Sequence, residues 1–399
     1  MKINLAVFFG CRSVEHEVSI ISAVQAMASM DREKYNIYPV YVTKEGQTVT
    51  GNTLFNIESF QDIPSLLNKC EAVTFLRKGG RVVMSKLGKG IFASKKETPI
   101  DVAFPIVHGT NCEDGTIQGL FEFLDLPYVG CDVISSAVGM DKAVFKDVLK
   151  RYNLPVLDCI TFYAREYAED KEKAVLKILE KIGLPAIVKP VNLGSSVGIT
   201  KANTKEELFD AIDNAVSFAD KVLIEKAVTA LREINCSVLG DADECIASVC
   251  EEPFMTDEIL SYEDKYTSGG GKKSGGSKGM ASLSRKVPAD LEKEQEEYIK
   301  DLACKIFKAL GCCGVVRIDF MIDTSTNTVY ANEINTIPGS LSFYLWQPAG
   351  VPYAELLDRM IALAFRRQRK KEELTFTIDT NILSGVKLGG TKGSKGSKI

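Results

Sequence analysis

Four polar side chains in the last quarter of the chain could together hold a metal ion and a phosphate group. Arg317 and Asp319 are separated by one apolar residue, and so are Glu333 and Asn335, a spacing that places both members of each pair on one face of a β-strand. Two carboxylates and an amide oxygen are hard ligands that suit Mg²⁺. An arginine beside them suits a phosphate or a developing oxyanion. The pattern therefore indicates phosphoryl-transfer chemistry.

The segments that carry these residues predict a β-hairpin. Residues 314–323 and 328–336 have strand alternation, and the polar turn 324–327 separates them. If the turn pairs odd-numbered with odd-numbered residues, the four polar side chains form one cluster backed by an apolar face. The alternative is a solvent-exposed ion pair on an ordinary hairpin, but the continuation EINTIPG after residue 332 favours the metal site.

A second group of residues could bind the phosphates and ribose of a nucleotide. A loop of small residues, 193–199, follows Lys189, and the backbone N–H groups of such a loop can approach an anion closely. It lacks the GK[ST] ending of a Walker A motif, and taken alone an ordinary hairpin turn is an equal alternative. Lys142 and the pair Glu225-Lys226 strengthen the nucleotide interpretation, because they add phosphate-binding cations and a carboxylate that can accept ribose hydroxyls.

Short apolar runs alternate with amphipathic stretches along the chain, which predicts an α/β protein. The expected strands are 3–9, 101–107, 186–191 and 221–224, and the expected helices are 14–30 and 205–218. We predict domains at 1–130, 131–228 and 229–372, followed by a tail at 373–399. Stretches 268–279 and 389–398 have the Gly, Ser and Lys-rich composition of flexible segments.

The bulk composition is that of an ordinary globular protein. The 399 residues are 45% hydrophobic and 26% charged, and a formal net charge of -4 gives no electrostatic footprint for nucleic acid or an anionic membrane. The N-terminus does not resemble a secretory signal, and no apolar run is long enough to span a bilayer. Eleven cysteines without CxxC pairs suggest neither a disulfide framework nor a zinc ribbon. We therefore expect a cytoplasmic protein that binds neither nucleic acid nor membrane.

Taken together and in this order, the motifs resemble those of the D-alanine:D-alanine ligase family of the ATP-grasp superfamily. The resemblance covers roughly residues 3 to 365. Besides the segments above, it includes EHEVS at 15–19, HGTNCEDGT at 108–116, MDK at 140–142, Arg232-Glu233 and Lys265-Tyr266. It implies an ATP-grasp fold of mixed α and β structure, preceded by an N-terminal Rossmann-like domain.

The resemblance also implies a role for each residue of the site. For the nucleotide, the contacts with ATP phosphates would come from Lys142, Lys189 and Lys265, and those with adenine and ribose from Glu225, Lys226, Val228 and Glu233. Two Mg²⁺ ions, which Mn²⁺ could replace, would be held by Asp319, Glu333 and Asn335. For the substrates, Glu15 would bind the ammonium of the first D-alanine with Ser195 and Tyr266 hydrogen-bonded to it, His108 would lie near that donor, and Arg317 and Gly339 would form the oxyanion site.

The implied reaction is the ATP-dependent ligation of two D-alanines through an acyl phosphate, for peptidoglycan synthesis, in an enzyme expected to be a homodimer. A lid at 261–284 would exclude water from the acyl phosphate. One rival is a ligase with another acceptor, such as D-serine, D-lactate or another amino acid, although Tyr266 argues against lactate. The other rival is a regulatory protein that binds nucleotide without turnover, and the retained metal ligands argue against it.

Several features depart from the family pattern. Cys11 and Cys112 stand where the family usually has glycine, and we expect both to be buried, inert thiols. His16 is expected to make structural hydrogen bonds, and Trp346 to pack in the core. The segment 339–346 is shorter than the usual acceptor-binding stretch. Ser340 and Ser342 therefore compete for the acceptor carboxylate, and we favour Ser342.

Overall fold

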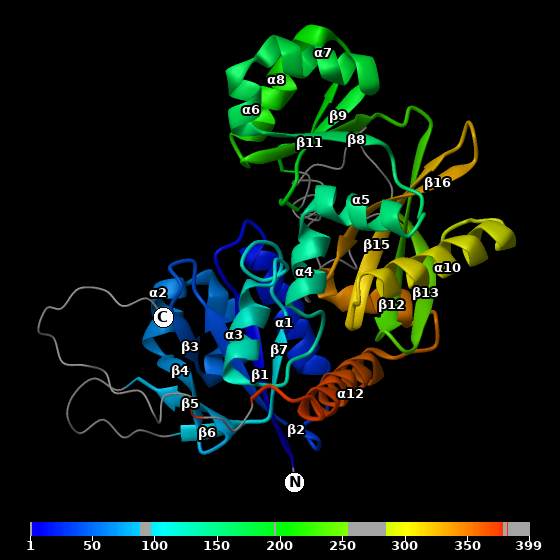
Figure 1. Cartoon of the computed structure of the whole chain (residues 1–399). Coiled ribbons are helices and arrows are strands. Elements are labelled where there is room, and N and C mark those ends of the chain that lie inside the picture. Colours follow the sequence, from blue (N-terminus) through cyan, green and yellow to red (C-terminus); the bar gives the residue numbers. More distant parts are fainter. Residues whose placement is uncertain (1, 88–96, 195–196, 254–284, 378–380, 382–399) are drawn as a thin grey trace, which may run out of the picture.

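The chain folds into three β-sheets with helices packed against them (Figure 1). The computed structural model describes residues 2–87, 97–194, 197–253, 285–377 and 381. In the described part, the N-terminal sheet has the strand order β6-β5-β4-β3-β2-β1-β7, the central sheet β10-β9-β11-β8, and the C-terminal sheet β14-β13-β12-β15-β16. The predicted α/β class is confirmed.

The N-terminal sheet has a parallel part and an antiparallel extension. Strand β1 (Ile3–Gly10) lies between β2 (Tyr35–Val42) and β7 (Val102–Pro105), and both pairings are parallel. Six consecutive buried residues in β1 explain its central position, because a strand covered on both faces is continuously apolar. The remaining elements are β3 (Thr48–Thr50), β4 (Glu71–Lys78), β5 (Arg81–Lys86), β6 (Glu97–Ile100), α1 (His16–Ser29), η1 (Asn52–Phe55), η2 (Ile57–Gln61), α2 (Ile63–Asn68) and α3 (Thr116–Leu124).

The central sheet is antiparallel and lies at the top of Figure 1. Its strands are β8 (Cys159–Tyr163), β9 (Ala186–Pro190), β10 (Thr200–Ala202) and β11 (Lys221–Lys226), and its helices are α6 (Ala164–Glu169), α7 (Lys171–Lys181) and α8 (Lys205–Val216). Apolar residues of α7 and α8 form one core with those of the sheet. Because β9 pairs with β10, the small-residue loop 193–199 lies in the connection of an antiparallel pair.

The C-terminal sheet is also antiparallel and packs one face against α10 (Lys293–Ala309). Its strands are β12 (Leu231–Gly240), β13 (Cys245–Pro253), β14 (Arg285–Lys286), β15 (Gly314–Asp323) and β16 (Thr328–Asn335), followed by η4 (Gly339–Ser342), α11 (Phe343–Trp346) and α12 (Tyr353–Glu372). Helix α5 (Lys142–Arg151), preceded by α4 (Val133–Met140), places Phe145 and Leu149 in this same core. The predicted domain limits stay a proposal.

The β15–β16 hairpin is confirmed, but the reason given for its polar face is wrong. The four-residue turn pairs Asp323 with Thr328, which is odd with even. A β-bulge then adds one unmatched residue, Asn332, so that the register shifts by one. Only beyond the bulge do odd residues face odd residues, with Asp319 opposite Glu333 and Arg317 opposite Asn335.

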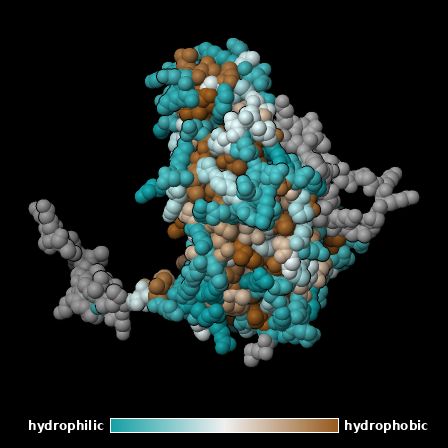
Figure 2. All heavy atoms as spheres, turned by 90° about the vertical axis from the view of Figure 1, so that its right-hand side faces the viewer, coloured by the Kyte–Doolittle hydropathy of each residue, from teal (hydrophilic) through white to brown (hydrophobic). Residues whose placement is uncertain are grey.

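Most other element predictions agree with the structure. The four expected strands correspond to β1, β7, β9 and β11, and the two expected helices to α1 and α8, each within a few residues. No helix in the described part of the chain is both long and apolar enough to cross a membrane. On the face seen in Figure 2, hydrophilic residues predominate and hydrophobic residues are interspersed among them.

Candidate active site

A row of polar residues crosses the C-terminal sheet on the face opposite α10. Glu251 on β13 pairs with Asn235 on β12, Asn235 pairs with Asp319 on β15, and Asp319 pairs with Glu333 on β16. Directly paired residues on neighbouring antiparallel strands share a face, so all four side chains belong to one surface. Sequence reasoning found the last two residues and missed the first two.

A signal for the missing residues was present in β12. Glu233, Asn235 and Ser237 alternate there with the buried apolar residues Ile234 and Cys236, the same period of two that identified the hairpin. The alternation shows which face of β12 is polar. It does not show which strand lies next to β12, and only that pairing brings Asn235 beside Asp319.

Arg317 and Asp319 form a bidentate ion pair in this row. The Arg317 guanidinium donates to both Asp319 oxygens at 2.6 Å, and the Asn335 amide donates to Asp319 at 3.1 Å. Burial opposes the charge of Arg317, but Asp319 outweighs it and raises the pKa of the guanidinium well above its usual range. The pKa of Asp319 is raised by burial and by Glu333, against the opposing effect of Arg317. A carboxylate whose ionisation is opposed by burial and by a neighbouring carboxylate is suited to bind a cation.

The donor set fits a magnesium ion in its chemistry. Asp319, Glu333 and Asn335 supply carboxylate and amide oxygens, and Mg²⁺ commonly keeps several waters and takes further oxygens from substrate phosphates. Among the described residues no group of three or more His, Cys, Asp or Glu side chains could hold a metal by itself. Three protein ligands leave the other positions around a Mg²⁺ ion to waters and phosphate oxygens.

Two buried lysines, one on the central sheet and one on α5, meet the carboxylate of Glu225 on β11. Lys189 Nζ on β9 lies 2.5 Å from Glu225 Oε1 and donates to the bulge residue Asn332 at 3.0 Å. Lys146 Nζ on α5 lies 2.6 Å from Glu225 Oε2, an ion contact that lacks hydrogen-bond alignment. Burial tends to raise the pKa of Glu225, but Lys189 and Lys146 outweigh it and bring the pKa to about 2. Lys146 was not predicted, although it follows Lys142 by four residues on one helix face.

Lys142 connects the small-residue loop to strand β16. It is the first residue of α5. The side chain of the N-cap residue Asp141 accepts hydrogen bonds from the backbone N–H groups of Ala143 and Val144. The ammonium of Lys142 donates to the Leu193 carbonyl at 2.8 Å and lies 3.1 Å from Glu333 Oε2. The side chain is 9% exposed, so its charge is poorly screened and available to a phosphate at this position.

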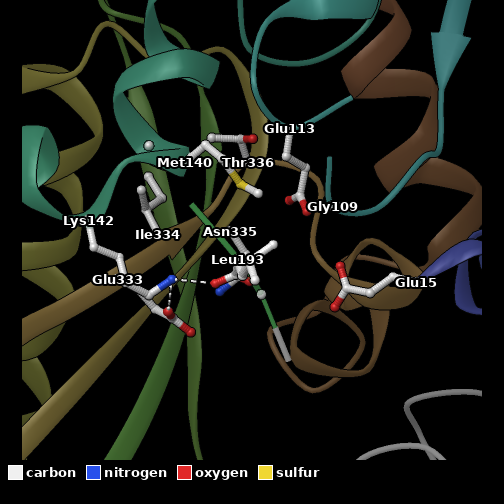
Figure 3. Close-up of a pocket in the computed structure, with 12 residues that line it drawn as sticks. Glu15, Gly109, Glu113, Met140, Lys142, Leu193, Glu333, Ile334, Asn335 and Thr336 are labelled. Atoms are coloured by element: carbon white, nitrogen blue, oxygen red, sulfur yellow. Dashed lines mark hydrogen bonds and ion pairs between the residues drawn. The ribbon is translucent and has the colours of Figure 1, made fainter. Parts of the chain in front are cut away.

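One recess collects residues of β16, of α4 and α5, of the loop that follows β9, and of the loops before α1 and α3 (Figure 3). It holds about 420 Å³, part of it open to solvent. Its lining includes four predicted site residues, Glu15, Lys142, Glu333 and Asn335, together with Gly109, Glu113, Gly139, Met140, Leu193, Gly194, Ile334 and Thr336. In Figure 3, Glu15 lies across the recess from Lys142 and Glu333.

Glycines allow the loops around Glu15 to approach closely. Gly109 has a φ of +76°, and a Cβ there would lie 2.5 Å from Ser13 Oγ and 3.0 Å from Glu15 Oε2. Gly194 brings the small-residue loop to the other side, where a Cβ would lie 3.4 Å from Glu15 Oε1. Larger residues would displace the carboxylate, so the glycines place Glu15 at the recess.

His108 and Glu113 clamp the backbone of one residue, Ile337, behind the recess. His108 Nδ1 donates to the Ile337 carbonyl at 2.7 Å, and the Ile337 N–H donates to Glu113 at 2.9 Å. Because a carbonyl only accepts, His108 Nε2 accepts from Ser22 Oγ at 2.8 Å. Burial lowers the pKa of His108, which agrees with this neutral form. Burial and the nearby Glu15 raise the pKa of Glu113 to about 8, although its backbone donors oppose this.

The segment after the clamp has an unusual backbone. Ser340, Leu341 and Ser342 all have positive φ values of 50° to 53°, a left-handed conformation that is uncommon for residues other than glycine. Ser340 is hydrogen-bonded to α1, because its hydroxyl donates to Gln25 Oε1 and its backbone N–H donates to Ser22 Oγ. Ser342 Oγ is buried and has no hydrogen-bond partner among the described residues. Neither serine lines the recess.

Other predicted residues lie away from the recess or outside the described residues. Lys226 is exposed and donates to the Leu184 carbonyl at 2.5 Å. Val228 follows β11 and Glu233 lies on β12, both partly buried, and Gly339 begins η4. The predicted residues Ser195, Lys265 and Tyr266, the lid 261–284 and most of the tail 373–399 lie outside the described residues.

The structure decides the expectations for the side chains that depart from the family pattern. His16 contacts the Cys11 carbonyl at 2.6 Å and the Tyr41 hydroxyl at 2.9 Å, and Trp346 is fully buried, so both structural predictions are confirmed. Cys112 is buried with a raised pKa, as expected. Cys11 is different, because it is only partly buried and a hydrogen bond with the Cys112 thiol lowers its pKa to about 7 despite burial.

The fold and the site define an ATP-grasp enzyme, in which two sheets face each other with lysines and carboxylates between them. Solved structures have the same architecture. The D-alanine–D-alanine ligase from Coxiella burnetii matches with a TM-score of 0.76 and 30% identity over 93% of this chain and 97% of that chain. The VanG D-Ala:D-Ser ligase from Enterococcus faecalis matches with a TM-score of 0.75 and 31% identity over 91% of this chain and 100% of that one.

Sequence comparisons narrow the class to one family. Models of the D-ala D-ala ligase N-terminus and C-terminus match residues 4–131 and 148–362. A D-alanine–D-alanine ligase from Thermosipho melanesiensis is 39% identical over 389 residues, which cover 97% of this chain and 99% of the relative. The chain belongs to the D-alanine–D-alanine ligase family.

Proposed function

We propose that this chain joins two D-alanines to D-alanyl-D-alanine, with cleavage of ATP, to supply peptidoglycan synthesis. The observation that carries the proposal is the recess of Figure 3, where the carboxylate of Glu15, at the start of α1, lies across from Lys142 and Glu333. An amino acid held by Glu15 would have its carboxylate directed toward the phosphate-binding side. Family membership supports the same reaction.

Each side of the recess has a separate task. Lys142 and Lys189 hold the phosphates of ATP, and Glu15 orients the donor by its ammonium, so that the donor carboxylate is positioned to attack the γ-phosphate. That attack releases ADP and forms an acyl phosphate. The acceptor amine then attacks its carbonyl carbon and displaces phosphate, which forms the peptide bond. Arg317, held charged by Asp319, stabilises the oxyanion of that step together with the backbone at Gly339.

Asp319, Glu333 and Asn335 would hold magnesium. When bound, Mg²⁺ supplies the charge that offsets the phosphate oxygens during transfer. Lys142 already contacts Glu333 at 3.1 Å, so the same carboxylate links the metal side to the phosphate-binding lysine. The adenine and ribose contacts proposed for Glu225, Lys226, Val228 and Glu233 follow from family membership.

Donor recognition should be strict, and acceptor recognition depends on another segment. Glu15 is 7% exposed, and a donor without an ammonium would lose the charge interaction with this buried carboxylate. The acceptor side is proposed at residues 339–346, with Ser342 holding the acceptor carboxylate. D-Serine is the second candidate acceptor, because the similar Enterococcus structure is named a D-Ala:D-Ser ligase. We also propose a cytoplasmic homodimer.

One assay tests the proposal and its alternatives. Purified protein is incubated with ATP and Mg²⁺ and with D-alanine alone, D-alanine plus D-serine, or D-alanine plus D-lactate, and phosphate release and product mass are measured. Equimolar phosphate and D-alanyl-D-alanine are expected. A mixed product that dominates at equal acceptor concentrations would reassign the acceptor. Nucleotide binding without phosphate release from any mixture would support the regulatory alternative.

A further inference from the structure

Lys146 is a buried lysine to which neither the motifs nor the recess assigns a task. It lies on α5, four residues after Lys142, and its side chain is 1% exposed. Lysine is almost never fully buried unless it is paired. Burying an ammonium ion removes several kcal/mol of hydration, so its position needs a physical reason.

That reason lies in how Lys146 shares a carboxylate with Lys189. Glu225 presents one oxygen to each lysine, Oε1 to Lys189 at 2.5 Å and Oε2 to Lys146 at 2.6 Å. A carboxylate paired with Lys189 alone could turn both oxygens toward it and neutralise it. With Lys146 on the second oxygen, Glu225 is divided between two cations, and the three groups together keep one positive charge.

The positive charge that Lys146 adds matters because further carboxylates lie near Lys189. Besides Glu225, Lys189 faces Glu333 and Glu233, while Lys142 contacts Glu333. Lysines 142, 146 and 189 therefore balance carboxylates 225, 233 and 333. Without Lys146 the group would carry a net negative charge, which would repel the phosphates of a nucleotide.

We propose that Lys146 is a positioning residue of the nucleotide subsite, which occupies one oxygen of Glu225 so that Lys189 stays available to the phosphates of ATP. The inference rests on the proposed ATP-binding function and adds a residue to it. Lys146 acts through Glu225 and does not itself need to touch the nucleotide. The arrangement is stable over the neutral pH range, because the two lysines hold the pKa of Glu225 at about 2 despite burial.

The test compares Lys146→Met with Lys150→Met in the full-length protein. Lys150 lies one turn further along α5, and its 40% exposed side chain contacts the exposed Asp158 at 3.3 Å, so its loss is a matched control. Dissociation constants of ATP, ADP and adenosine are measured by calorimetry or by competition, without D-alanine. Lys146→Met should weaken ATP and ADP binding about tenfold and leave adenosine within about twofold.

Rescue and stability separate positioning from simple support of the fold. Lys146→Arg should restore ADP affinity, because it returns the charge, whereas Lys146→Gln should not. Lys146→Gln keeps a donor for Glu225 and serves as the neutral variant if Lys146→Met does not fold. Lys150→Met should leave all three affinities unchanged.

Two results would overturn the inference. Unchanged ADP affinity in both neutral variants would show that Lys189 does not depend on Lys146. An equal loss for ADP and adenosine would show a structural role only. If the wild-type protein itself binds no ATP or ADP, the failure belongs to the proposed function rather than to the role of Lys146.

Discussion

Replacing Glu251 by glutamine should strongly destabilise the C-terminal sheet. Glu251 begins the polar row that leads to the metal site, and its side chain is 1% exposed. One oxygen lies 2.7 Å from Arg285, and the other accepts from Asn235 at 3.0 Å and from the Tyr344 hydroxyl at 3.1 Å. Glutamine keeps the shape of the side chain but removes the charge and directs donor hydrogens toward a neighbour that is itself a donor.

The expected loss follows from burial on both sides of the pair. Arg285 is 9% exposed, and removing one partner of a buried ion pair commonly lowers the free energy of unfolding by about 3–5 kcal/mol. The adjacent Glu252 provides the matched control. It makes two 2.7 Å contacts with Arg232, but these side chains are 22% and 26% exposed. Solvent screening should limit the loss in Glu252→Gln to about 1 kcal/mol.

Urea unfolding followed by tryptophan fluorescence measures this difference. Trp346 is the single tryptophan of the chain and donates to Ser237 on β12, so its emission reports on the C-terminal sheet. Equal losses for Glu251→Gln and Glu252→Gln would refute the burial argument. The double variant Glu251→Gln/Arg285→Met should be less destabilised than Glu251→Gln alone, because the second charge is also gone. If the double variant loses as much free energy of unfolding as the two single variants together, the pairing of Glu251 with Arg285 is contradicted.

Three further predictions concern the site itself. Glu333→Gln should reduce Mg²⁺-dependent phosphate release by several orders of magnitude, because a charged metal ligand is lost, and a normal rate at saturating Mg²⁺ would remove the metal assignment. Ser342→Ala should raise the acceptor KM by the equivalent of about 1–3 kcal/mol and leave the ATP KM unchanged, whereas the same effect in Ser340→Ala would move the role to Ser340. Burial lowers the pKa of His108, so the folded state favours the neutral imidazole. The contribution of His108 to stability is therefore present above the unfolded pKa of about 6.5 and is lost as the pH falls below it. The urea midpoint of the wild type should therefore fall more between about pH 7.5 and 5.5 than that of His108→Asn, and parallel curves would contradict the assignment.

Much of the site follows from local pattern. Period-two alternation was enough to predict the β15–β16 hairpin and to place Arg317 with Asp319 and Glu333 with Asn335 on one face of each strand, because a strand directs successive side chains to opposite sides. The small residues at 193–199 and the order of the motifs indicated where a nucleotide would bind. These patterns involve residues close together in the chain, so they can be recognised without knowing which segments are neighbours in the fold.

Tertiary structure decided the features that depend on register and on contacts between distant segments. The turn alone would have placed Arg317 opposite Ile334, and only the bulge at Asn332 turns Arg317 toward Asn335. The bulge shifts the alternation of β16 by one residue, so its buried positions are Val329, Ala331 and Ile334, and the polar residues Asn332 and Glu333 are direct neighbours. Two successive polar residues do not by themselves show that a strand is bulged, so the register followed only from the folded hairpin.

The buried charges depended on tertiary structure in the same way. Lys146 has the spacing of a helix-face residue and by composition belongs on a surface, yet the fold brings it 2.6 Å from Glu225, which is 79 positions away in the numbering (225 minus 146). Burying this lysine is tolerable only because that carboxylate arrives with it. The sequence by itself therefore determined the strands, the loop and the kinds of side chain at the site, whereas the pairing of buried charges required the folded chain, because their energy depends on neighbours that no local pattern specifies.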